Sequence, residues 1–159
     1  MEAIAGLSED EKNRLSVVSL ARHEPEMAKE LAEAGSICEF HYPGFLSDAR
    51  PWLERADIGF VLSYKEACSF ACREMLAMGL PVIVSDFMIL VNNINENCGW
   101  VTKTKDAESI RQVLRAILAM PPEQITAMKI AARQKAEADF ALGNMLDHTD
   151  RVYDEIMKK

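Results

Sequence analysis

The sequence predicts an α/β domain built on an open parallel β-sheet of about five strands, with helices on both faces. Three observations predict it. The 159 residues fit one compact domain, so a single domain is expected over residues 1–159. Short apolar runs rich in β-branched residues alternate with amphipathic stretches, which is the pattern of βα units. Gly and Pro residues punctuate this alternation where helices begin and end.

The first elements are a strand, a helix and a weaker strand. Leu15–Leu20 is rich in β-branched residues, which favours a strand. Glu24–Ala34 is predicted to be a helix, because Pro25 stands in its first turn and Gly35 follows its end. Ile37–His41 has a shorter apolar run and predicts a weaker strand.

The middle of the chain holds two helices and two buried strands. A short helix is expected over Asp48–Ala56, after a turn-rich segment. The apolar run Ile58–Leu62 predicts a buried strand, and a second one is predicted over Pro81–Ser85. Between them the pattern predicts a helix over Phe70–Met78 that ends at Gly79.

The last part of the chain is mainly helical. Phe87–Asn97 is apolar and then rich in Asn, which predicts a short helix followed by a loop. Gly99–Lys103 predicts the last strand. Three amphipathic segments separated by Pro121-Pro122 and Gly143 predict helices over Ala107–Met120, Glu123–Asp139 and Asn144–Met157.

Charge and cysteine content exclude several classes of function. The chain has 18 Lys and Arg against 25 Asp and Glu, a net charge of −7, and its basic residues form no stripe, which argues against nucleic-acid binding. The four cysteines form no CxxC pair, so neither a metal site nor a metal cofactor is expected. The opening residues show no signal peptide, and Gly79–Val91, the longest apolar stretch, is too short to span a bilayer. A cytoplasmic protein is therefore expected.

The loop after the Ile58–Leu62 strand carries the chemistry. In open Rossmann-like sheets, ligands bind outside the carboxyl ends of the strands. Glu66 lies just past the strand, and Ser69 is placed to cap the next helix, whose first N–H groups favour a phosphate. Glu74 follows roughly 7.5 Å further along the helix axis. Carboxylates accept hydrogen bonds from diols, so the pair fits a ligand with hydroxyls around a charged centre, such as a nucleotide sugar.

The same loop resembles a known family. Glu66 and Glu74 form an E-x7-E pattern, and Met75–Ile83 (MLAMGLPVI) follows it. Further along the chain come Ser85-Asp86 and then Asn97–Val101 (NCGWV), in the same order as the motifs of this family. From about residue 15 to the C-terminus, the chain resembles the C-terminal, donor-binding domain of the family 4 (group 1) retaining glycosyltransferases, which is one half of a GT-B fold.

The resemblance implies a role for each matching residue. It assigns Glu66 as the catalytic carboxylate, which binds hydroxyls of the donor sugar, and Glu74 as the ligand of the nucleotide ribose. The donor is a nucleoside-diphosphate sugar (UDP- or GDP-linked), the acceptor a saccharide or lipid-linked saccharide, and no metal or other cofactor is needed. Donor sugar and phosphate are expected at the backbone of Ala67, Cys68, Ser69 and Phe70, and the base at the loop Tyr42, Pro43 and Gly44.

Two departures from the family limit this assignment. Ala67, Cys68 and Ser69 stand where the family often has Gly-Phe-Gly, and without the two glycines a positive φ there is not supported. The loop after Asp86 lacks the family's Gly-Gly pair, and contacts made by that loop are not carried over. We expect Asp86 itself to cap the turn that follows it.

The resemblance also implies that this chain holds only one of the two domains of the enzyme. In the family the active site lies between two Rossmann-like domains, and we expect the N-terminal acceptor domain to be absent from this chain. The isolated domain is then expected to be inactive. Contact with a membrane is expected only through that missing domain or through a lipid-linked acceptor. Peripheral association with the inner face of the membrane is therefore an open alternative to a purely cytoplasmic location. Polysaccharide or lipopolysaccharide biosynthesis is the process implied.

Two other functions remain open from the residues alone. Paired carboxylates are also the acid and nucleophile of glycoside hydrolases. Against this, Glu66 precedes a helix N-terminus, where the dipole favours a negative charge and opposes the role of a proton donor. A non-catalytic nucleotide-binding or interaction domain is the other alternative.

Overall fold

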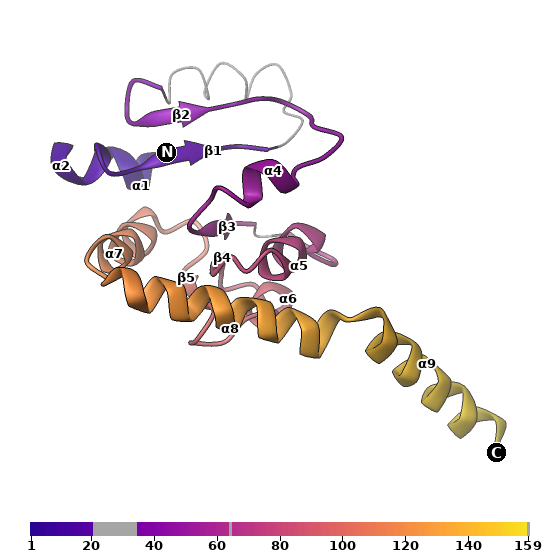
Figure 1. Ribbon diagram of the computed structural model, residues 1–159. Helices are drawn as coiled ribbons and strands as arrows, with labels where there is room; N and C mark the ends of the chain where they lie inside the picture. Colours follow the sequence, from indigo (N-terminus) through magenta and orange to yellow (C-terminus); the bar gives the residue numbers. More distant parts are fainter. Residues whose placement is uncertain (21–34, 64, 159) are drawn as a thin grey trace. The chain divides into compact units, whose positions relative to one another are not determined.

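The computed structural model describes residues 1–20, 35–63 and 65–158 (Figure 1). The chain divides into two compact units, each made from two segments. Residues 1–54 and 105–121 form the first unit, and residues 55–104 and 122–159 form the second. The predicted helix Glu24–Ala34 lies outside the described residues.

The first unit contains a two-stranded parallel sheet and short helices. Val17 of the first strand lies opposite Phe40 of the second. Between Ser8 and Glu11 a reciprocal capping box opens the second helix: the Glu11 carboxylate accepts from the Ser8 amide at 2.7 Å, and the Ser8 hydroxyl accepts from the Glu11 amide at 3.3 Å. The elements of this unit are α1 (Glu2–Ala5), α2 (Glu9–Lys12), β1 (Ser16–Val18), β2 (Glu39–His41), α4 (Arg50–Leu53) and α7 (Ala107–Leu118).

Arginine contacts join the start of the chain to α7. The Arg111 Nε donates to the carbonyl of Ala3 at 3.2 Å. Arg115 Nε lies 3.0 Å from a carboxylate oxygen of Glu11. The unit is therefore closed by contacts between residues far apart in the sequence.

The second unit contains a three-stranded parallel sheet with β4 in the middle. Its strands are β3 (Gly59–Val61), β4 (Val82–Ser85) and β5 (Gly99–Thr102). All four residues of β4 are buried, as expected of a central strand with both faces covered. Thr102, at the end of β5, donates its hydroxyl to the carbonyl of Val84 at 3.1 Å.

Four helices accompany this sheet: α5 (Phe70–Ala77), α6 (Met88–Val91), α8 (Pro122–Phe140) and α9 (Leu142–Met157). Helix α5 packs against β3, β4 and α8. Ala132 and Ala136 of α8 are buried in the same core cluster as Cys72 and Leu76 of α5, and such small side chains allow the two helices to approach closely. Helix α9 follows α8 directly and contributes no residue to this cluster (Figure 1).

The observed elements confirm the predicted α/β class, with helices flanking parallel strands. The five strands of the described residues are hydrogen-bonded as two separate sheets, β1–β2 and β3–β4–β5. Helices α1 and α2 are additional to the predicted elements. Across residues 1–20, 35–63 and 65–158, no helix combines the length and apolar character needed to cross a membrane.

Candidate functional site

The loop between β3 and α5 begins at the carboxyl end of β3. Ser63 fixes its first turn, because its hydroxyl accepts from the amide of Lys65 at 3.3 Å and donates to the Lys65 carbonyl at 3.0 Å. The hydroxyl of Ser85, the last residue of the adjacent strand β4, donates to the carbonyl of Ser63. The loop is thereby held to the neighbouring strand end, at the edge where parallel sheets bind ligands.

Ser69 caps α5, as predicted. Its side chain is 2% exposed, and its hydroxyl accepts from the amide of Cys72 at 3.4 Å. The amide of Arg73 donates to the Ser69 carbonyl at 3.2 Å, which closes the first helical turn. The helix ends before Gly79, whose φ of +75° is the left-handed conformation that glycine adopts without strain.

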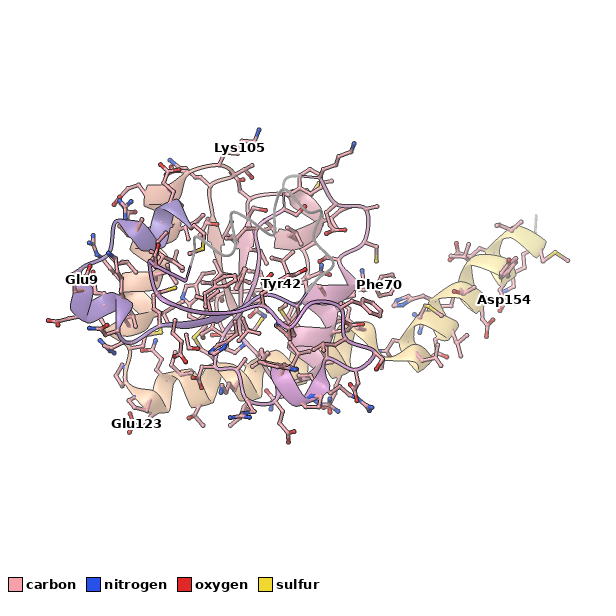
Figure 2. All side chains as sticks on the ribbon, turned by 90° about the horizontal axis from the view of Figure 1, so that it is seen from above. Glu9, Tyr42, Phe70, Lys105, Glu123 and Asp154 are labelled. Atoms are coloured by element: carbon pink, nitrogen blue, oxygen red, sulfur yellow. The ribbon has the colours of Figure 1, made fainter. Side chains whose placement is uncertain are left out.

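Backbone amides are available at this helix start. Among the predicted donors, the amide of Phe70 is occupied, because it donates to the carbonyl of Cys68 at 3.0 Å. In the described part of the chain, the amides of Ala67, Cys68, Ser69 and Ala71 have no protein acceptor. Together with the helix dipole, such N–H groups attract an anion. Figure 2 shows Phe70, which marks the start of α5 and is 68% exposed.

One predicted carboxylate precedes this helix start in the chain and the other follows it. Glu66 is half-buried in the loop, and Glu74 is exposed on the second turn of α5. Neither carboxylate has a hydrogen-bond or ion-pair partner among the residues that the structure describes. Both are therefore able to accept hydrogen bonds from the hydroxyls of a ligand.

Cys72 lies in the first turn of α5 and is fully buried. Burial raises the pKa of its thiol to about 11, and the nearby Cys98 and the charge of Glu66 add to the shift. A thiol with this pKa is protonated at neutral pH, so Cys72 is a packing residue and no nucleophile.

Asp86 has a different partner from the one predicted. Its carboxylate accepts from the Thr104 amide at 2.8 Å and from the Thr104 hydroxyl, which together lower the Asp86 pKa. The turn that follows Asp86 starts at Phe87, and no described side chain caps it. Asp86 therefore joins the segment after β4 to the segment after β5.

The predicted base-binding loop belongs to the first unit. Tyr42, Pro43 and Gly44 follow β2 directly, and Tyr42 is 37% exposed. Gly44 has a φ of +79°, so this turn requires glycine. Glu66, residues 67–70 and Glu74 all belong to the second unit.

Two residues of the site were not found from the sequence. The amide of Ala71 replaces that of Phe70 among the donors without an acceptor. Arg73 contacts Asn93 and Phe140, which are remote from it in the chain. A local pattern carries no signal for either contact.

Comparison with known proteins identifies a family and a fold. The family model described as "Glycosyl transferases group 1" matches residues 1–120. No curated protein sequence matches the chain significantly. The structure resembles HepE of Anabaena, solved with UDP and glucose, with a TM-score of 0.80 and 12% identity over 97% of this chain and 43% of HepE.

Two further solved structures share the fold. WaaG, a glycosyltransferase involved in lipopolysaccharide biosynthesis, has a TM-score of 0.75 and 24% identity over 87% of this chain and 38% of WaaG. Sucrose-phosphate synthase of Thermosynechococcus elongatus has a TM-score of 0.73 and 20% identity over 89% of this chain and 38% of the synthase. The chain thus spans less than half the length of each of these proteins.

Proposed function

Because the chain belongs to the group 1 glycosyl transferases, we propose that it binds a nucleoside-diphosphate sugar and forms the donor half of a retaining sugar transfer. The acceptor is a saccharide or a lipid-linked saccharide. The observation that carries the proposal is the pair Glu66 and Glu74 around a helix start whose amides have no protein acceptor.

The diphosphate binds at the start of α5. The amides of Ala67, Cys68, Ser69 and Ala71 donate to its oxygens, and the helix dipole favours its negative charge. The same donors stabilise the charge that develops on the leaving diphosphate as the bond to the sugar breaks. These contacts therefore serve both donor binding and transfer.

The two carboxylates bind the two ends of the donor. Glu66 accepts hydrogen bonds from the sugar hydroxyls, and Glu74 accepts them from the ribose diol. A UDP-sugar is the first donor to test, because HepE was solved with UDP-glucose.

The acceptor half of the reaction is proposed to come from a second domain outside these 159 residues. The chain alone then binds the donor without transferring its sugar. This agrees with its coverage of only 43% of HepE.

Isothermal titration calorimetry tests donor binding directly. The folded chain is titrated with UDP, GDP, UDP-glucose and GDP-mannose, each to millimolar concentration. We expect saturable binding of one nucleotide and its sugar. If none of the four binds, the proposed function is wrong.

Two variants test the division of roles between the carboxylates. We expect Glu74→Ala to weaken UDP and UDP-glucose about equally, by roughly tenfold, because a hydrogen bond to a charged group contributes about 1.5–3 kcal/mol. Glu66→Ala should remove only the extra affinity that the sugar provides. Glu123→Ala, at the exposed start of α8 (Figure 2), is the matched control and should bind both like the wild type. Equal losses for both ligands in Glu66→Ala would contradict this division.

A further inference from the structure

Arg73 joins α5 to two other parts of the second unit. Its Nε donates to Asn93 Oδ1 at 3.4 Å, and its guanidinium carbon lies 5.0 Å from the centre of the Phe140 ring. Asn93 is 4% exposed, and its side-chain Nδ2 donates to the carbonyl of Ile89 at 3.0 Å. A chain of contacts thus runs from α6 through Asn93 and Arg73 to the end of α8.

The partners of Arg73 set it apart from the other half-buried cations of this unit. Lys129 is paired with Asp57 at 2.9 Å and Lys135 with Asp139 at 2.6 Å. Arg73 has no carboxylate within ion-pair distance in the described residues, and its contacts are an amide oxygen and an aromatic face. The planar guanidinium group holds both partners in one fixed geometry, because its Nε donates to the amide oxygen while its carbon lies over the ring; the flexible ammonium group of lysine does not fix this geometry.

Arg73 is also the residue that closes the first turn of α5. Its amide donates to the carbonyl of Ser69, and the Ser69 hydroxyl accepts from the preceding residue, Cys72. Fixing the Arg73 side chain therefore fixes the turn that carries the free amide of Ala71 and precedes Glu74. We propose that Arg73, held by Asn93 and Phe140, is a positioning residue that sets the donor-binding start of α5.

This inference rests on the proposed donor site and predicts a loss of affinity without unfolding. Arg73→Lys keeps the positive charge but removes the guanidinium group that contacts Asn93 and the Phe140 ring. We expect it to weaken UDP-glucose binding about tenfold, since small displacements of binding groups are costly. Asn93→Asp keeps the acceptor that faces Arg73 but loses the donor to the Ile89 carbonyl, so its affinity should lie between those of Arg73→Lys and the wild type.

The matched control acts on the other end of the same helix. Arg133 donates to the carbonyl of Ala77 at 2.6 Å and pairs with Glu137 at 2.7 Å. Arg133→Lys should lower stability to a similar extent and leave UDP-glucose affinity unchanged. Calorimetry of the full chain gives affinity, and urea denaturation gives stability.

Amide hydrogen exchange in the ligand-free chain separates this inference from the proposed function. We expect Arg73→Lys to speed hydrogen exchange at two backbone amides, that of Cys72 and that of the residue at position 73. Arg133→Lys should leave both amides protected. If the wild type binds no nucleotide, the proposed function fails, and the exchange data alone decide whether Arg73 fixes the helix start. If the wild type binds and Arg73→Lys binds equally well, the positioning role is overturned. Should Arg73→Lys not fold, Phe140→Leu replaces it, with the same expected losses.

Discussion

At the residue scale, the spacing between β4 and β5 leaves no room for a side chain at Gly99. A Cβ atom there would lie 2.4 Å from the carbonyl oxygen of Val82, which is backbone and takes part in the sheet. We expect Gly99→Ala to lower the free energy of unfolding by about 1–3 kcal/mol, because overpacking forces the strands to shift. Urea denaturation measures this. Gly143→Ala, where nothing lies within 4 Å, is the control and should be neutral or slightly stabilising.

The buried thiol of Cys72 makes stability depend on pH. Burial raises its pKa from the ordinary 9.0 to about 11, so the thiol stays protonated in the fold. In the unfolded chain it ionises from about its ordinary value, which favours unfolding at high pH. The raised pKa of Cys72 therefore stabilises the fold fully below about pH 9. This stabilisation is lost as the pH rises toward about 11.

The corresponding experiment compares unfolding midpoints from pH 7 to pH 11. We expect the wild type to lose more stability across this range than Cys72→Ala, whose stability is lower throughout because of the cavity it leaves. Lysine and tyrosine titrations are common to both chains and cancel in the difference. Parallel pH profiles would contradict the prediction.

At the element scale, α9 is a helix whose apolar side chains lie at the surface. Leu142, Met145, Val152 and Ile156 recur at helical spacing, and each is more than half exposed. No residue of α9 belongs to the core cluster of its unit. We therefore expect the stability of the core not to depend on this helix.

A truncation tests this independence. A chain that ends after Ala141 should keep the wild-type free energy of unfolding to within about 1 kcal/mol and self-associate less, because its exposed apolar helix is gone. Urea denaturation and sedimentation velocity measure the two effects. A chain that ends after Ala131 is the control, and it should not fold stably, because it loses the buried Ala132 and Ala136. If the chain that ends after Ala141 loses several kcal/mol of its free energy of unfolding, α9 supports the core and the prediction is wrong.

At the scale of the whole molecule, local patterns predicted the elements well. The buried strands β3 and β4 follow from the apolar runs IGFVL and PVIVS, and Gly79 ends α5 where it was expected. Helix α2 was missed, although Ser8 and Glu11 form the S-x-x-E pattern of a capping box. The division into two sheets was not predicted, because strand pairing is not a property of any one segment.

The candidate site was predictable in part for the same reason. Ser69 as a helix cap depends on its immediate neighbours, and it was found. The contact between Arg73 and Asn93 joins residues twenty positions apart, and the bond from Thr104 to Asp86 spans eighteen. Such contacts depend on how parallel strands bring their following loops together, which a sequence pattern does not contain.

The discontinuous first unit has a consequence for how the chain is synthesised. Arg111 reaches back to Ala3 across 108 positions, and Arg115 reaches Glu11 across 104. At a ribosomal rate of about 5–20 residues per second, α1 and α2 emerge at least several seconds before α7 exists. During that interval α1, with its buried Ala3, lacks its contact with α7. The first unit therefore cannot be completed until residues 105–121 have been synthesised, although its first segment is made long before them.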